Sequence, residues 1–187
     1  MRVLVACEFS GRVRDAFLEK GHDAWSVDLE WTESENQSRH LKDDVLKYID
    51  DGWDLMIAHP PCKYLAWSGE RWMKGDPERQ QKRKEALSFF RRLRNAPIDK
   101  ICIENSLSWF LRREYMWETQ LVHPFHFGDP YRKSTCLWLK GLKPLMPTNF
   151  TFKREKGVHD MWPSATREKD RSRTYPGIAR AMAEQWG

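Results

Sequence analysis

The sequence has little of what marks a metal-binding, disulfide-stabilised or membrane-spanning protein. Its four cysteines, Cys7, Cys62, Cys102 and Cys136, lie far apart, and no two have the C-x-x-C spacing of a zinc site. We therefore expect neither a metal centre nor a disulfide framework. No apolar run approaches the length of a membrane span, and the start of the chain lacks the pattern of a signal peptide. These absences favour a soluble intracellular protein.

No internal repeat and no clear linker divides the 187 residues, so we expect a single domain over residues 1–187. Residues 149–173 are polar and basic, with little periodicity, and are predicted to be irregular. The net charge of +5 and the sequence pI of about 9.0 mildly favour a polyanionic partner. Ten tryptophans are many for this length. Most should lie in the core or at partly buried surface, and some should stack on bases or cover a pocket.

Short apolar runs alternate with amphipathic stretches in the order that is typical of an α/β fold. Strands are predicted at residues 2–6, 24–28, 55–58, 100–105 and 135–139, and helices at residues 12–20, 78–95 and 178–186. Gly21 is expected to end the first helix. The prediction is a single doubly wound, mostly parallel sheet.

The helix predicted at residues 78–95 is rich in Lys and Arg, and its apolar face includes Leu87 and Phe90. One interpretation is a solvated amphipathic helix that packs on the sheet. The other is a surface that faces phosphate groups. The sequence favours the first interpretation and leaves the second open.

The stretch from Leu55 to Cys62 is the strongest local signal. Residues 55–58 form a short apolar run that suits a strand covered on both faces. Pro60 and Pro61 cannot donate ladder hydrogen bonds, so this strand must end by His59. Cys62 then lies on a stiffened loop at the carboxyl end of a strand, where doubly wound sheets bind ligands. We interpret it as a candidate nucleophile, because a thiol is partly ionised near neutral pH; a structural cysteine on a proline-rich loop has similar weight.

Two acids follow other strands of the predicted sheet. Asp28 ends the second strand. In nucleotide-binding α/β units, an acid at this position accepts hydrogen bonds from the ribose hydroxyls. Glu104 ends a later strand and is expected at the same sheet edge as Cys62. A desolvated glutamic acid has a raised pKa, which would let it donate a proton to a ring nitrogen. The alternative for Glu104 is a cap for the following helix.

Several short segments, in their order along the chain, resemble the motifs of the cytosine-5 DNA methyltransferases. The resemblance is strongest to compact phage- and prophage-type proteins of that kind. The similar segments are Phe9-Ser10-Gly11 (the S-adenosylmethionine loop), Asp28 (the ribose-binding acid), Asp43-Asp44-Val45 (the adenine-contacting motif), Pro60-Pro61-Cys62 (the nucleophile loop), Glu104-Asn105 (the Glu-Asn motif) and Pro176-Gly177-Ile178-Ala179 (the last motif). The resemblance implies a methyltransferase-like Rossmann fold without a full target-recognition domain.

The resemblance also implies an activity, which is methyl transfer from S-adenosylmethionine to C5 of cytosine in DNA. Its implied catalytic residues are Cys62 and Glu104, with Arg132 or Arg173 holding the base carbonyl or a phosphate. Its implied cofactor-binding residues are Phe9, Ser10, Gly11, Asp28, Asp44 and Pro60. The implied substrate is DNA, double- or single-stranded, or a cytosine nucleotide, and a protein partner could supply specificity. The implied location is the cytoplasm of a bacterium or of a phage-infected cell.

Two departures from the family keep other functions open. Val13 or a neighbour replaces the second glycine of the cofactor loop, and little room is left for a target-recognition domain. The second hypothesis is therefore a catalytically silent protein on the same fold that binds nucleic acid or a nucleotide. The third is an enzyme that uses the same thiolate addition for a different modification at C5 of a pyrimidine.

Overall fold

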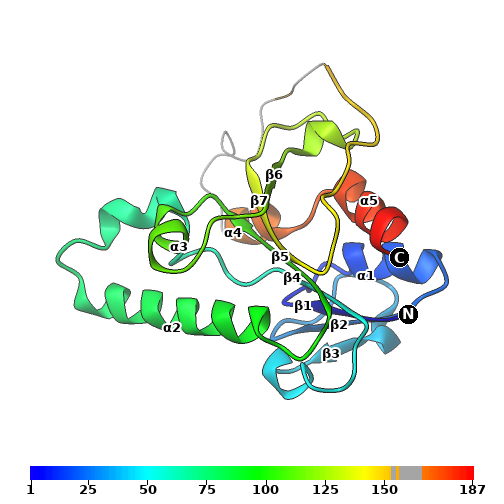
Figure 1. The fold of residues 1–187 in the computed structure, drawn as a ribbon, viewed down its shortest axis with the longest axis horizontal. Coiled ribbons are helices and arrows are strands. Elements are labelled where there is room, and N and C mark those ends of the chain that lie inside the picture. The colour runs from blue at the N-terminus through cyan, green and yellow to red at the C-terminus, as the bar shows by residue number, and fades with distance from the viewer. Residues whose placement is uncertain (153–154, 156–165) are drawn as a thin grey trace.

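The computed structural model describes residues 1–152, 155 and 166–187, which form one mixed sheet with helices on both faces (Figure 1). The strands are β1 (Arg2–Ala6), β2 (Asp23–Asp28), β3 (His40–Lys42), β4 (Leu55–Ala58), β5 (Lys100–Ser106), β6 (Gln120–Val122) and β7 (Thr135–Lys140). The α-helices are α1 (Arg12–Glu19), α2 (Pro77–Arg94), α3 (Trp109–Glu114), α4 (Arg167–Ser172) and α5 (Pro176–Trp186). Short 3₁₀ turns are η1 (Gln37–Arg39), η2 (Val45–Lys47), η3 (Trp67–Trp72) and η4 (Pro124–His126).

The seven strands lie in the order β3-β2-β1-β4-β5-β7-β6. All pairs from β3 to β5 are parallel, whereas β7 is antiparallel to both β5 and β6. The predicted α/β class with a single, mostly parallel, doubly wound sheet is therefore confirmed. The apolar runs of β1 and β4 are buried on both faces, because helices cover the sheet on each side.

Alternate residues of the central strands feed two separate cores. Val3 and Val5 of β1 pack with α1 and α5 on one face. Leu4 and Ala6 pack on the other face, with the apolar side of α2 and with Leu111 of α3. Figure 1 shows α2 on the opposite side of the sheet from α1 and α5. This three-layer arrangement leaves the carboxyl edge of the parallel strands as the place where loops gather.

Most predicted boundaries hold to within two residues, and Gly21 follows α1 with a φ of 79°, as a helix-ending glycine does. The sequence did not indicate β3, β6 or α3. Of the segment 149–173, predicted to be irregular, residues 153–154 and 156–165 lie outside the described residues. The rest of that segment contains the short helix α4.

The structure favours the simpler interpretation of the basic helix α2. Arg83 is buried, and its guanidinium binds the carboxylate of Glu70 with N–O distances of 3.1 and 2.7 Å. Arg91 and Arg94 donate to backbone carbonyls of Glu114 and Leu139. Several of the basic side chains of α2 are thus bound within the protein.

Among the helices of the described residues, none is both long enough and apolar enough to cross a membrane.

Candidate functional site

The strand order reverses between β1 and β4, which are adjacent in the sheet. From β1 the chain continues to β2 on one side, and from β4 it continues to β5 on the other. The loops that leave the carboxyl ends of β1 and β4 therefore diverge, and in sheets of this kind the ligand crevice usually lies at such a point. The first loop carries Phe9, Ser10 and Gly11, and the second carries Pro60 and Cys62.

Four polar side chains form one row across this carboxyl edge. Ala6 pairs with Val27 and with Ala58, and Ala58 pairs with Ile103. The next residue of each strand or strand end therefore lies in a common row, whose members are Asp28, Cys7, His59 and Glu104. The row continues the register because Cys7 N donates to Val27 O at 2.8 Å and His59 N donates to Ala6 O at 2.9 Å.

Strand alternation places His59 and Glu104 on the face that follows Ile57 and Cys102, whereas Cys7, whose φ of 58° interrupts the alternation, packs against the core on the side of α2. Ile57 and Cys102, two positions before His59 and Glu104, pack in the core beside α1 and α5. The structure thus places Asp28 and Glu104 in one row along the carboxyl edge of the sheet. It adds Cys7 and His59 between them.

The half of the row near β2 is acidic. Burial, together with the nearby charges of Asp28 and Asp44, raises the pKa of the Cys7 thiol far above its usual value. Burial also raises the pKa of Asp28, against the opposing effect of its hydrogen bond from Glu30 N. Cys7 has a φ of 58°, a left-handed conformation that is uncommon outside glycine and is often found at functional sites.

Asp44 begins η2, where its Oδ1 accepts a hydrogen bond from Leu46 N at 2.9 Å. Asp44 also lies close enough to Cys7 for its negative charge to raise the pKa of the thiol. Asp44 therefore has a structural role as a cap, and its position beside the acidic half of the row is compatible with a second role in binding.

The first loop is fixed by a buried carboxylate. Glu8 is only 4% exposed, and its Oε1 and Oε2 accept hydrogen bonds from Val13 N at 2.7 Å and Arg14 N at 3.2 Å. These are free N–H groups of the first turn of α1, which attract a carboxylate. Gly11 adopts a φ of 73° just before that turn. Val13, where the resemblance leads one to expect a glycine, is a buried core residue of α1.

The loop after β2 covers part of the first loop. Glu33 N donates to Phe9 O at 2.9 Å, and a Cβ at Gly11 would meet the Ser34 Cβ at 2.6 Å. Arg173 binds the Glu33 carboxylate through two bonds of 2.7 and 2.8 Å. The side chain of Lys169 lies 4.8 Å from the centre of the Phe9 ring. Segments far apart in sequence thus meet over Phe9.

Cys62 lies in the open part of the site. It is the exposed cysteine of the four. Its carbonyl oxygen accepts hydrogen bonds from Leu65 N at 3.0 Å and Ala66 N at 2.8 Å, so the chain turns tightly after it. The buried Asn105 side chain donates to Pro60 O at 2.8 Å. The Glu104-Asn105 pair at the end of β5 therefore fixes the loop that presents Cys62.

His59 and Glu104 form a largely buried pair beside that loop. His59 Nδ1 lies 3.3 Å from Glu104 Oε2, and the two side chains are 6% and 15% exposed. Burial pushes the pKa of Glu104 upward, but the hydrogen bond from His59 and the charge of Lys133 outweigh it, so the pKa lies below its usual value. The prediction of a raised pKa was therefore wrong, because it considered burial without these two partners. The alternative role as a helix cap was also wrong, because Ser108 caps α3.

The two arginines named from the sequence have different surroundings. Arg132 is exposed, and its guanidinium makes no hydrogen bond or ion pair with the described residues. Arg173 is engaged with Glu33 and Asp170. Lys133, which the sequence did not single out, is the cation whose charge reaches Glu104.

Sequence reasoning missed Glu8, His59 and Lys133. Each of them precedes or follows a residue that was recognised, so only the folded register shows that they belong to the site. Two signals were nonetheless present, an acid directly before the first loop and a histidine before two prolines. Within the described parts of the chain, no three His, Cys, Asp or Glu side chains gather as a metal site would require.

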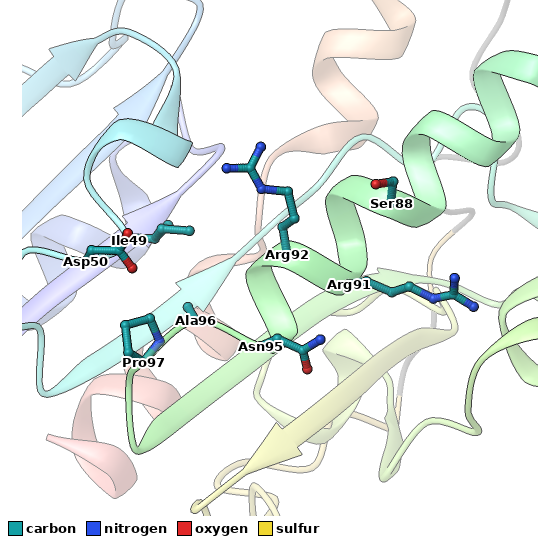
Figure 2. Close-up of a pocket in the computed structure, with 8 residues that line it drawn as sticks. All are labelled: Ile49, Asp50, Ser88, Arg91, Arg92, Asn95, Ala96 and Pro97. Atoms are coloured by element: carbon teal, nitrogen blue, oxygen red, sulfur yellow. The ribbon is translucent and has the colours of Figure 1, made fainter.

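An open hollow of about 330 Å³ lies at the opposite edge of the sheet (Figure 2). It is lined by Ile49, Asp50, Ser88, Arg91, Arg92, Asn95, Ala96 and Pro97. Figure 2 shows Arg91 and Arg92 pointing in different directions, so their charges do not converge on one ligand. The polar row and Cys62 remain the candidate site, because they combine convergent polar groups with perturbed pKa values.

No protein-family model and no curated protein sequence matches the chain. Solved structures do match its fold. One is a protein described as a DNA modification methyltransferase encoded within a prophage of E. coli (TM-score 0.51, 16% identity, covering 81% of this chain and 52% of that one). Another is the methyltransferase EhMeth of Entamoeba histolytica (TM-score 0.52, 14% identity, covering 88% of this chain and 61% of that one).

The chain has a methyltransferase-like fold. At these identities the likeness is one of fold, and the chain spans between half and two thirds of the length of the structures it matches. The methyltransferase-like fold agrees with the strand order and with the crevice between β1 and β4.

Proposed function

We propose that the protein transfers a methyl group from S-adenosylmethionine to C5 of cytosine in DNA, with Cys62 as the nucleophile. The observation that carries the proposal is that an exposed thiol, a largely buried glutamate paired with a histidine, and two acids near Cys7 all follow the carboxyl ends of strands in a methyltransferase-like sheet. Because a fold alone does not imply an activity, the chemistry must rest on these side chains.

The residues that follow β1, β2 and β4 have the chemistry that the cofactor would need. Asp28 ends β2 with a carboxylate that could accept bonds from ribose hydroxyls, and Asp44 lies on the same side. Phe9, Ser10 and Gly11 would line the cofactor from the first loop, and Pro60 would do so from the second. When bound, S-adenosylmethionine supplies an electrophilic methyl group on a sulfonium sulfur.

Cys62 would act on the cytosine ring. Its thiolate adds at C6, which makes C5 nucleophilic enough to take the methyl group. A base then removes the C5 proton, and elimination of the Cys62 sulfur restores the aromatic ring. The exposed loop leaves room for a base that has been turned out of a duplex or offered by a single strand.

Glu104 would hold the cytosine while negative charge develops on its ring. In its ionised form it can accept a hydrogen bond from the exocyclic amine. A bond to ring N3 needs a proton, and His59 can hold that proton 3.3 Å from the Glu104 carboxylate. His59 is therefore a positioning residue that would keep Glu104 oriented and supply it with a proton. Arg132, whose guanidinium is exposed, is proposed to bind a phosphate, and the ion-paired Arg173 to fix the cover of the crevice.

The first test is calorimetric titration of the protein with S-adenosylmethionine, beside the Asp28→Ala variant. We expect binding of the cofactor and a loss of about tenfold or more in affinity in the variant, which is the effect of removing a charged hydrogen-bond partner. Glu35→Ala is a matched control, because Glu35 is an exposed acid of the loop that follows β2. Equal affinity in Asp28→Ala and wild type would contradict the proposed cofactor site.

A second function is favoured by the cover over the first loop. Ser34 lies so close to Gly11 that a Cβ at Gly11 would clash with it. Arg173, which is bound to Glu33, lies over the Phe9 ring. These contacts would suit a silent protein that binds nucleic acid or a nucleotide and has no use for a cofactor crevice. Two results together would favour this function over the first. The folded protein would bind DNA in a salt-dependent way, and titration with S-adenosylmethionine would give no heat of binding.

A further inference from the structure

Three exposed tryptophans lie near the Cys62 loop, although most tryptophans of a soluble protein are largely buried. Trp67, Trp109 and Trp117 are 57%, 48% and 63% exposed. We call these three residues the tryptophan face. An indole offers a large apolar surface to water, so several of them together mark a binding surface better than they mark a core.

The tryptophan face is tied to the nucleophile loop by hydrogen bonds. Ser108 Oγ donates to Leu65 O at 2.5 Å, and Trp67 N donates to Leu107 O at 2.9 Å. Leu65 N in turn donates to Cys62 O. Because Ser108 is also the cap of α3, the helix that begins at Trp109 is fixed directly to the loop that carries Cys62.

Arg112 holds two of the indoles in place. Its guanidinium carbon lies 4.9 Å from the ring centre of Trp109 and 4.4 Å from that of Trp117. The two rings are nearly perpendicular, with centroids 6.4 Å apart. Glu118 neutralises Arg112 by a bidentate ion pair. Arg112 thus holds the two indoles in fixed positions. Because they are already ordered, binding of a ligand to them costs less conformational entropy.

Free positive charge lies beside the tryptophan face. Lys63, Arg71 and Lys74 are exposed, and none forms an ion pair with the described residues. Arg71 also covers the ring of Trp72 at 4.8 Å. An open hollow of about 490 Å³ lies between residues 70–74 and the first half of α2, and Arg71 and Lys74 are among the residues that line it. Phosphate groups would neutralise these cations.

We propose that the tryptophan face binds single-stranded nucleic acid, with bases stacked on its indoles and phosphates at Lys63, Arg71 and Lys74. Rigid aromatic faces next to unpaired cations are the combination that single-stranded segments need. In a duplex the faces of the bases are stacked on one another and cannot reach an indole. The inference deepens the proposed function and rests on it for one point, that the strand would carry a cytosine to Cys62.

The test is binding of a fluorescent oligothymidylate of about 15 nucleotides, measured by anisotropy and compared with the oligothymidylate–oligoadenylate duplex of the same length. Thymidylate contains no cytosine, so the measurement is independent of methyl transfer. We expect the single strand to bind at least about tenfold more tightly than the duplex. We also expect Trp109→Ala and Trp117→Ala each to weaken single-strand binding by roughly 5- to 150-fold, the effect of losing one stacked base.

Trp31→Ala is the matched control, because Trp31 is 64% exposed and carries Lys42 over its ring at 5.0 Å but follows β2 at the other end of the sheet. Its affinity should equal that of wild type. Trp67→Ala serves as a second variant if loss of Trp109 unfolds α3, because Trp67 is held through its backbone. Tighter binding of the duplex, no binding of oligothymidylate, or equal losses in Trp109→Ala and Trp31→Ala would overturn the inference.

The outcomes separate the two proposals. Oligothymidylate binding that depends on the tryptophan face, in a protein that transfers no methyl group, supports this inference and contradicts the proposed activity. Methyl transfer that is unchanged when the tryptophan face is removed contradicts this inference and leaves the proposed activity in place.

Discussion

His59 Nδ1 lies 3.3 Å from Glu104 Oε2, and both side chains are largely buried at the end of adjacent parallel strands. His59 also lies near Glu8. Burial raises the pKa of the Glu8 carboxyl, and the charge of His59 opposes that effect. The imidazole thus lies between the Glu8 carboxylate that fixes the first loop and the Glu104 carboxylate at the end of β5. This placement makes His59 the link between the two halves of the site.

His59→Gln should lower kcat for methyl transfer by about 10²-fold, because Glu104 loses the group that orients it and supplies its proton. The KM for S-adenosylmethionine should stay unchanged, because His59 does not belong to the proposed cofactor site. If His59 had only a structural role, the pH profile of kcat would be the same in the variant and in wild type. We expect this profile to shift in the variant. A variant with the wild-type kcat and pH profile would contradict the assignment.

The same pair predicts a change in acid stability. The pKa of Glu104 is lowered in the folded protein, so it contributes stability that is present above its usual pKa and is lost as the pH falls through the folded value. Without the hydrogen bond from the imidazole, burial dominates and the pKa of Glu104 rises. His59→Gln should therefore unfold at a higher pH than wild type when fluorescence is followed from pH 7 down to pH 2. Coincident acid transitions would show that the pair has no such effect.

One thiol should react far faster than the others in the folded protein. Cys62 is exposed, whereas burial raises the pKa of Cys7 and Cys102 well above their usual values and that of Cys136 to about 12. Because the thiolate is the reactive form, a disulfide reagent at pH 8 should label about one thiol in a fast phase. Cys62→Ser should remove this phase and leave the slow ones. A fast phase that persists in Cys62→Ser would place the reactive thiol elsewhere.

The ion pair between Glu33 and Arg173 should stabilise the protein by about 1 kcal/mol at pH 7, as a bidentate pair near the surface does. The pKa of Glu33 is lowered to about 2, first of all by the hydrogen bond from Arg173. Its contribution is therefore complete above the usual pKa of a glutamate and is lost as the pH falls towards 2. Urea midpoints of wild type and Glu33→Gln should differ at pH 7 and converge near pH 2.

Glu35→Gln is the control for this effect, because Glu35 lies in the same loop and is exposed. It should match wild type at both pH values. A difference between wild type and Glu33→Gln that is the same at pH 7 and pH 2 would mean that the ion pair is not its source.

The sequence predicted the strands that carry the site because β1, β4 and β5 each contain an apolar run that is buried on both faces of the sheet. It could not predict β3 and β6, which are three-residue edge strands without an apolar run. Cys62 and Glu104 were placed at one edge because both follow strands, and Asp28 was placed at the end of the second strand. Their partners could not be found in this way, since the contact of His59 with Glu104 spans 45 residues and depends on strand register.

The cover of the crevice was beyond sequence reasoning for a related reason. Glu33 and Arg173 are 140 residues apart, and each lies in a polar stretch that shows no periodicity. Arg173 was recognised as a candidate cation, but its partner follows from the tertiary packing of α4 beside the first loop. A charged residue in an irregular segment gives no local sign of the acid that it will meet.

The most direct test of the central claim uses DNA in which 5-fluorocytosine replaces cytosine. A base cannot remove the fluorine that takes the place of the C5 proton, so the Cys62 sulfur is not eliminated and the adduct should persist. Incubated with S-adenosylmethionine and a single-stranded oligonucleotide of this kind, the protein should gain the mass of the oligonucleotide plus one methyl group. Digestion should place the bond at Cys62, and Cys62→Ser should form no adduct. Methyl transfer to ordinary cytosine that continues in Cys62→Ser, or no transfer and no adduct in wild type, would contradict the account.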